Sequence, residues 1–199
     1  MATAAHLIIT IIFIVGCYQF YFHAQRAPAR QVRELSTTLD DAIPFRPQWV
    51  WVYSFLFYPI LIAVVFLAND SREFVFLIFS FAMVLLAQLA CFHVFPVQTP
   101  LRWRDFTPQC RASRFLHLVQ SMDGPGASFP SMHVSVSTLA ALHLAAGLQP
   151  ALGTLALAAY GFPVLIGMSA VYTKQHYLID LPFGAALGYG CYRAWLLIF

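Results

Sequence analysis

The sequence predicts an all-α fold that crosses a membrane several times. Composition is the first reason, because 60% of the 199 residues are apolar and only 10% are charged. A soluble domain typically has about 45–50% apolar and about 25% charged residues. The second reason is that long apolar runs alternate with short polar connections, and a spanning helix needs about 20 mostly apolar residues. We therefore predict a single integral membrane domain over residues 1–199, folded as a bundle of six spanning helices.

The six predicted spans are the runs that are long and apolar enough, or nearly so, to cross the bilayer. The fourth and fifth are separated only by a turn at 147–150, where glycine and proline interrupt the apolar pattern. In order, the spans are residues 6–22, 49–68, 74–95, 132–148, 151–171 and 178–199.

Three polar connections, 24–47, 96–130 and 172–177, fall on the same membrane face if there are six spans. The first is a candidate amphipathic helix lying in the interface, and the second is predicted to be the active-site loop. Nine of the eleven Lys and Arg residues lie on this face. The positive-inside rule would make it cytoplasmic, although a site for anions would collect the same charges.

Several classes of protein are disfavoured. The net charge is only +3 and no basic block is interleaved with aromatic residues, so nucleic acid is not an expected partner. The four cysteines form no CxxC pair, and we expect neither a disulfide framework nor a zinc site. Ionisable residues gather at one interface and not in the middle of the spans, which argues against a transporter or channel subunit.

The connection before the last span contains a histidine and an acid at helical spacing. His176 and Asp180 are four residues apart, so one helical turn would place them on the same face. Pro182 indicates that the helix begins near Asp180, because proline suits a first turn. The carboxylate could then fix one imidazole nitrogen and leave the other free to attack. Taken alone, the pair could equally be an ordinary helix cap.

The start of the fourth span has the pattern of an anion site. Pro130 breaks the preceding loop, and Ser131 is a favourable N-cap. The backbone N–H groups that follow would point out of the helix end, where anions bind. His133 lies in the first turn and could act as a general acid. The alternative is a capped membrane helix with an interfacial histidine.

Arginines follow the third span. Arg102 can hold two phosphate oxygens with its planar guanidinium, and Arg104 is a weaker candidate for the same task. The alternative is that both bind lipid headgroups at the interface. Together with the two preceding stretches, they would supply a nucleophile, its orienting acid, a proton donor and cations. Metal-free phosphoryl transfer needs this set, so we predict such a site with no metal and no cofactor.

The residues resemble the motifs of the type 2 phosphatidic acid phosphatase superfamily, which are Lys-x6-Arg-Pro, Pro-Ser-Gly-His and Ser-Arg-x5-His-x3-Asp. The Pro-Ser-Met-His stretch at 130–133 matches the second motif apart from its glycine. Ser169, His176 and Asp180 match the third with the correct spacing, while Ala170 replaces its arginine. The resemblance covers roughly residues 95–185 and also implies six helical spans.

The resemblance implies the catalytic roles. His176 would attack phosphorus and form a phosphohistidine, and Asp180 would orient it. His133 would protonate the leaving group. No metal would be required.

The resemblance also implies which residues hold the phosphate. Arg102 is the counterpart of the first-motif arginine, although Phe95 stands where the motif has lysine. Lys174 could replace the charge of the missing third-motif arginine. Ser131 would contribute at the start of the helix.

Parts of the sequence look more like the inositol phosphorylceramide synthase and sphingomyelin synthase branch, whose members pass a phospho-headgroup to a lipid alcohol. We therefore keep three alternatives: a lipid phosphatase, a headgroup transferase, and a non-catalytic scaffold or lipid-binding protein. The expected partners are the bilayer and a phospholipid, lipid phosphate or polyprenyl diphosphate. The resemblance to the family implies a site on the extracytoplasmic or lumenal side, whereas the distribution of Lys and Arg implies the cytoplasmic side. The sequence predicts no oligomeric state.

The remaining ionisable residues are expected to be structural. Asp123, beside the Gly-Pro-Gly stretch, is interpreted as a turn residue. The other histidines are expected to be packed or interfacial, and His93 could support the site from behind. They are His6, His23, His93, His117 and His143.

Overall fold

The computed structural model describes residues 2–26, 31–124 and 126–199. Within these residues the chain forms helices and two isolated β-bridges but no strand, which confirms the predicted helical class. The α-helices are α1 (Ala2–Arg26), α2 (Thr38–Ala42), α3 (Phe57–Val64), α4 (Ser71–Val94), α5 (Arg111–Met122), α6 (Met132–Leu152), α7 (Gly161–Tyr172) and α8 (Asp180–Ile198). Shorter 3₁₀ or π turns are η1 (Pro47–Trp49), η2 (Val52–Leu56), η3 (Val65–Leu67), η4 (Leu101–Trp103) and η5 (Gly153–Tyr160).

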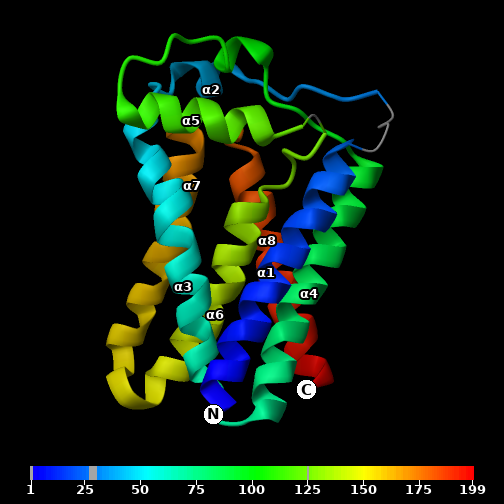
Figure 1. The fold of residues 1–199 in the computed structure, drawn as a ribbon, viewed down its shortest axis with the longest axis vertical. Helices are drawn as coiled ribbons and strands as arrows, with labels where there is room; N and C mark the ends of the chain where they lie inside the picture. Colours follow the sequence, from blue (N-terminus) through cyan, green and yellow to red (C-terminus); the bar gives the residue numbers. More distant parts are fainter. Residues whose placement is uncertain (1, 27–30, 125) are drawn as a thin grey trace.

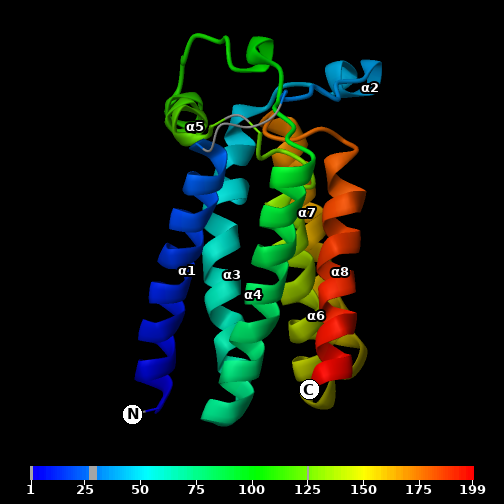
Figure 2. The same ribbon diagram turned by 90° about the vertical axis from the view of Figure 1, so that its right-hand side faces the viewer.

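The helices α1, α3, α4, α6, α7 and α8 stand side by side (Figures 1 and 2). In the middle of the bundle, α6 contacts α3, α4, α7 and α8. The polar connections gather at one end, where α2 and α5 lie, while α1 begins and α8 ends at the opposite end (Figure 1). The apolar core between α3, α4, α6 and α7 is formed by Phe57, Val64, Leu77, Ala140, Phe162 and Ile166.

Four segments are long and apolar enough to cross a membrane: Ala4–Gln25, Pro47–Leu67, Ser71–Val94 and Met132–Tyr172. The last has 41 residues, and a straight helix rising about 1.5 Å per residue would be about twice as long as the roughly 30 Å hydrocarbon core. Figure 1 shows that this segment reverses direction, so that α6 and α7 run antiparallel. The final helix, α8, is not among the four. Length and composition thus support four spanning segments, where the sequence predicted six.

The turn between α6 and α7 lies later than predicted. Instead of turning at 147–150, α6 continues to Leu152 and tolerates Pro150 in its last turn. At Gly147 a Cβ would lie 2.9 Å from a methyl group of Leu67, at the end of a side chain that can shift. The reversal occupies η5 and begins at Gly153, whose φ of 54° favours glycine. The first half of the predicted span 151–171 is therefore connecting structure.

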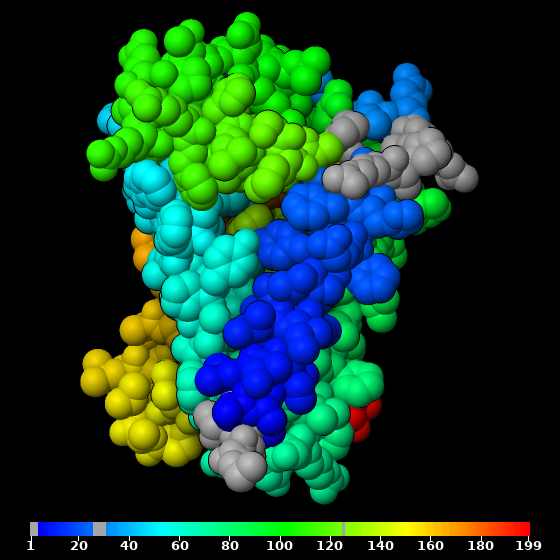
Figure 3. Space-filling view, in the orientation of Figure 1, coloured from blue at the N-terminus to red at the C-terminus, as the bar shows by residue number. Residues whose placement is uncertain are grey.

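The helix expected in the first polar connection is not found among its described residues. Between residues 24 and 47, the described residues are helical only at the end of α1 and in the short α2, and residues 27–30 lie outside the described part. The predicted loop 96–130 instead contains α5, which crosses the end of the bundle (Figure 1). Its buried residues Ala112 and Leu116 pack on Val50. Figure 3 shows α5 and the residues before it covering this end above α1 and α3.

Two glycines let α8 approach α6 closely. A Cβ at Gly184 would lie 2.6 Å from the carbonyl oxygen of Ser131, and one at Gly188 would lie 2.3 Å from the carbonyl oxygen of Ser135. Both atoms belong to the α6 backbone and cannot move aside as a flexible side chain could. Because Asp180 starts α8 and Ser131 caps α6, this packing fixes the distance between the two ends that carry the predicted site.

Gly188→Ala should therefore separate α8 from α6 and lower stability by about 1–3 kcal/mol, the usual cost of overpacking. The matched control is Gly190→Ala on the same helix, where a Cβ meets nothing within 4 Å. It should be neutral or stabilising, because alanine is the better helix former by about 0.5–1 kcal/mol. Thermal unfolding of the purified protein in detergent measures both. Equal midpoints for the two variants would contradict the close packing.

Candidate active site

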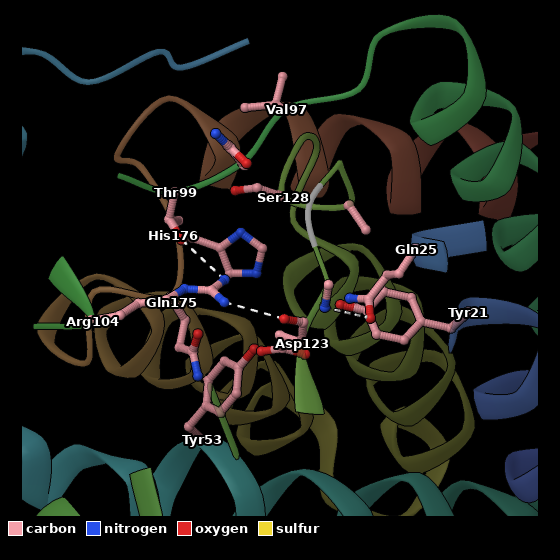
Figure 4. Close-up of a pocket in the computed structure, with 13 residues that line it drawn as sticks. Tyr21, Gln25, Tyr53, Val97, Thr99, Arg104, Asp123, Ser128, Gln175 and His176 are labelled. Atoms are coloured by element: carbon pink, nitrogen blue, oxygen red, sulfur yellow. Dashed lines mark hydrogen bonds between the residues drawn. The ribbon is translucent and has the colours of Figure 1, made fainter. Parts of the chain in front are cut away.

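A pocket lined mostly by polar side chains, the site cavity, lies at the end of the bundle where the polar connections gather. Its walls come from α1, from η2, from the connection between α4 and α6, and from the turn after α7 (Figure 4). The lining residues are Tyr21, Gln25, Tyr53, Val97, Gln98, Thr99, Arg104, Asp123, Gly124, Ala127, Ser128, Gln175 and His176.

Val97 holds three chain segments together at this cavity. It forms β-bridges with Arg33 on one side and with Ala127 on the other. The N–H of Ser128 donates to the carbonyl of Val97 at 2.9 Å, and the N–H of Gln98 donates to the carbonyl of Arg33 at 3.0 Å. Backbone pairing thus fixes the loop that follows α4 against the loop that precedes α6.

The turn after α7 places His176 in the cavity wall. Lys174 has a φ of 58°, the left-handed conformation that commonly ends a helix. The N–H groups of Gln175 and His176 both donate to the carbonyl of Ala170, at 2.9 and 3.4 Å. The chain therefore turns sharply at the end of α7, and the His176 ring faces the cavity (Figure 4).

His176 pairs with Asp180 as the spacing predicts. Nδ1 of His176 lies 3.0 Å from Oδ2 of Asp180. The same oxygen accepts hydrogen bonds from the Ser128 hydroxyl at 2.9 Å and from the Tyr177 N–H at 3.0 Å. Because a carboxylate accepts, the imidazole nitrogen that faces it carries the proton, and Nε2 holds the lone pair. None of the hydrogen bonds among the described residues uses Nε2, so this nitrogen can act as a nucleophile.

His133 lies beside this pair, in the first turn of α6. Its ring stacks on Tyr53 with 4.1 Å between centroids, and its Nδ1 is 2.9 Å from the Tyr53 hydroxyl. The centroids of His133 and His176 are 6.5 Å apart. The structure therefore brings together the two histidines that the sequence predicted. Tyr53 lines the cavity, whereas His133 is not among its lining residues.

Ser131 links the two helix starts. Its hydroxyl caps α6 by accepting the N–H of Val134 at 3.4 Å, and its own N–H donates to the carbonyl of Asp180 at 3.2 Å. The residue is fully buried and does not line the cavity. Its place is therefore structural, in contrast to the phosphate-binding role that the resemblance implied.

Arg104 is the cation in the cavity wall. Its Nη1 donates to the carbonyls of Asp123 and Gln120 at 3.1 and 3.3 Å, and its Nη2 donates to the Thr99 hydroxyl at 3.3 Å. Its Nε is buried and has no partner among the described residues. These hydrogen-bond partners are neutral, so the guanidinium can still bind an anion with charge-assisted hydrogen bonds.

Arg102 does not reach the cavity, which corrects the sequence-based prediction. Its Nη2 lies 3.0 and 3.1 Å from the two carboxylate oxygens of Asp41. Both side chains are about half exposed, at 54% and 51%. The hydrogen bond from Arg102, with one from Trp103, lowers the pKa of Asp41. The tight turn η4 explains the result, because residues two apart in such a turn point to different sides.

Lys174 also points away from the cavity. Its ammonium group donates to the carbonyl of Asp40 and lies 4.9 Å from the centre of the Trp103 ring. Burial lowers the pKa of this amine, while the charges of Asp41 and Asp40 oppose the shift. Lys174 therefore anchors α2 over the turn that carries His176, and the structure does not place it as a substitute for the missing arginine.

Three residues of the cavity wall were not among the site residues predicted from the sequence. Asp123, expected to be a turn residue, lines the cavity, and burial raises its pKa, with Arg104 and Gln25 opposing the shift. Gln175 is only 6% exposed, and its Nε2 has no partner among the described residues. Because Gln175 is next to the predicted nucleophile His176, the sequence could have marked it as a candidate site residue. Tyr53 lies inside an apolar run, and nothing in the neighbouring sequence marks it.

The part of the chain that the structure describes contains no group of three or more His, Cys, Asp or Glu side chains arranged to hold a metal ion. That the site works without metal or cofactor remains a prediction.

Comparison with protein families decides the membership of the chain. The family model described as PAP2 superfamily matches residues 31–194. The chain belongs to the PAP2 superfamily. Searches of curated proteins and of solved structures found no significant match. As a PAP2 protein with apolar helices of spanning length, it is a membrane protein whose family supports an enzyme of the phosphatase or phosphotransferase type.

The two arginines give a direct test of the site. Arg104→Ala should weaken the binding of inorganic phosphate about 10- to 100-fold, because hydrogen bonds to a charged group contribute about 1.5–3 kcal/mol. Arg102→Ala removes an exposed ion pair of small energetic value and should change binding by no more than about twofold. Phosphate-dependent thermal stabilisation in detergent measures both. Equal weakening, or a larger effect of Arg102→Ala, would contradict the placement of Arg104 in the binding wall.

Proposed function

We propose that this PAP2 protein is a membrane enzyme that cleaves a phosphate ester or diphosphate of an amphiphilic lipid through a phosphohistidine on His176. The observation that carries the proposal is the pairing of His176 Nδ1 with the buried Asp180, which leaves Nε2 available in a ring that lines the site cavity. Arg104 lines the same cavity. A nucleophile, its orienting acid and a cation are thus side by side.

The first chemical step follows from this arrangement. Nε2 of His176 attacks phosphorus, a P–N bond forms, and the P–O bond to the leaving group breaks. Asp180 stabilises the ring as it becomes positively charged, and Arg104 offsets the charge on the phosphoryl oxygens. His133 supplies the proton that the leaving oxygen takes up.

In the second step an acceptor attacks the phosphohistidine and regenerates the free imidazole. Water as the acceptor makes the protein a phosphatase, whereas a lipid alcohol makes it a headgroup transferase. We favour hydrolysis and treat transfer as the second candidate, because the Lys-Gln-His-Tyr stretch at 174–177 is similar to that of sphingomyelin synthases.

The substrate is proposed to be a phospholipid, a lipid phosphate or a polyprenyl diphosphate. The cavity lies at the end of a bundle whose outer surface is apolar, so a phosphate can bind at the membrane interface while its tail remains among the helices. The antiparallel course of α6 and α7, with α8 packed on α6, supports six membrane passes and one domain. In such a topology the cavity and the three polar connections share one membrane face.

The test is an assay of purified protein in detergent with EDTA, using lipid phosphates, diphosphates and phospholipids, with and without diacylglycerol, ceramide or inositol as acceptor. His176→Ala should lower turnover by at least about 10³-fold, since loss of a nucleophile removes most of the catalysis. The matched control is His117→Ala, an exposed histidine of α5 at the same end of the bundle.

Release of inorganic phosphate by wild type and by His117→Ala, but not by His176→Ala, supports a phosphatase. A new headgroup-bearing lipid that forms only with an acceptor supports the transferase. Turnover that survives in His176→Ala contradicts the proposal. If wild type forms no product from any substrate in the panel, a non-catalytic scaffold becomes the better account.

A further inference from the structure

Tyr53 stands between the site cavity and His133. It lies in η2, a π-type turn between η1 and α3, and is 5% exposed. A π turn contains an extra residue that changes the direction of its side chains, and such turns are frequent at functional sites. Here it places an aromatic side chain in the wall of the site cavity, opposite residues of the polar connections (Figure 4).

The contacts of Tyr53 and His133 define a pair. The tyrosine hydroxyl lies 2.9 Å from Nδ1 of His133 and makes no other hydrogen bond among the described residues. The two rings stack at an angle of 29°. Phe57 packs on His133 as well, with 4.8 Å between centroids. The imidazole thus packs against two aromatic rings, with one nitrogen directed to the hydroxyl.

We propose that Tyr53 is a further catalytic residue, which carries the proton of His133 to the oxygen of the leaving group. The inference rests on the function proposed above. It assigns direct contact with the leaving oxygen to Tyr53, because Tyr53 lines the cavity and His133 does not. A phenolic hydroxyl can accept one hydrogen bond while it donates another, which is what a relay requires.

The proton and bond changes balance. As the P–O bond breaks and Nε2 of His176 bonds to phosphorus, the leaving oxygen takes the hydroxyl proton of Tyr53. Tyr53 takes the Nδ1 proton of the His133 imidazolium, which becomes neutral. When water attacks the phosphohistidine, its proton returns along the same path and restores the imidazolium.

The test compares two phosphate monoesters whose leaving groups differ in their need for a proton. Octyl phosphate releases an alkoxide, which must be protonated, whereas p-nitrophenyl phosphate releases a stable phenolate. Tyr53→Phe should lower turnover of octyl phosphate about 10²- to 10⁴-fold, the usual contribution of general acid catalysis. Release of p-nitrophenolate in the first turnover should change by no more than about threefold, because the departure of this leaving group needs no proton.

His133→Ala should show the same selectivity. The double variant should be no slower on octyl phosphate than His133→Ala alone, because both residues serve one proton transfer. The matched control is Tyr58→Phe, which removes a hydroxyl of α3 that hydrogen-bonds Tyr18 at 2.6 Å outside the cavity. It should turn over both esters like wild type.

Three outcomes would overturn the inference. Equal losses on the two esters would make the role of Tyr53 structural. A selective loss in His133→Ala but not in Tyr53→Phe would mean that His133 protonates the leaving group directly. Additive losses in the double variant would separate the two residues. Absence of His176-dependent turnover of either ester by wild type would instead reject the proposed function, and the relay with it.

Discussion

Asp180 is fully buried at the start of α8, and one of its carboxylate oxygens accepts hydrogen bonds from three groups in two segments of the chain. Ser128 reaches it from the loop before α6, while Tyr177 and His176 reach it from the turn after α7. Its backbone carbonyl also accepts the N–H of Ser131. Because leaving a buried charge without its partner costs about 3–5 kcal/mol, this carboxylate holds the segments in one arrangement. The orientation of the His176 ring, and therefore the chemistry, depends on it.

The positive charges near the site have different tasks. Arg102 is paired with Asp41 at the surface. The ammonium group of Lys174 lies over the Trp103 ring and donates to the carbonyl of Asp40. Arg104 alone among these three lines the cavity. Ala170, which replaces an arginine of the family motif, is fully buried and uses its carbonyl to close the turn that presents His176. In the proposed mechanism, phosphate binding therefore depends on Arg104, and Gln175, whose Nε2 has no partner among the described residues, lines the same cavity.

Features set by local spacing could be predicted from the sequence, and features set by long-range packing could not. The pairing of His176 with Asp180 and the capping of α6 by Ser131 follow from positions three or four residues apart. Whether Arg102 or Arg104 lines the cavity depends on how η4 is oriented at the end of the bundle where the polar connections gather. Tyr53 reaches His133 across 80 positions of the chain, so the apolar pattern around it carried no signal. The helical class and the single polar end were predictable from composition, whereas the position of α5 and the late reversal after α6 depend on tertiary contacts.

The most direct measurement of the central claim is the location of the covalent intermediate. Purified protein would be mixed with a ³²P-labelled lipid phosphate that it hydrolyses, quenched in alkali within the first turnovers and digested for peptide mapping. The account predicts an acid-labile, alkali-stable label on the peptide that contains His176. Label on another residue, or no label from a substrate that is being hydrolysed, would contradict a nucleophilic His176 held by Asp180.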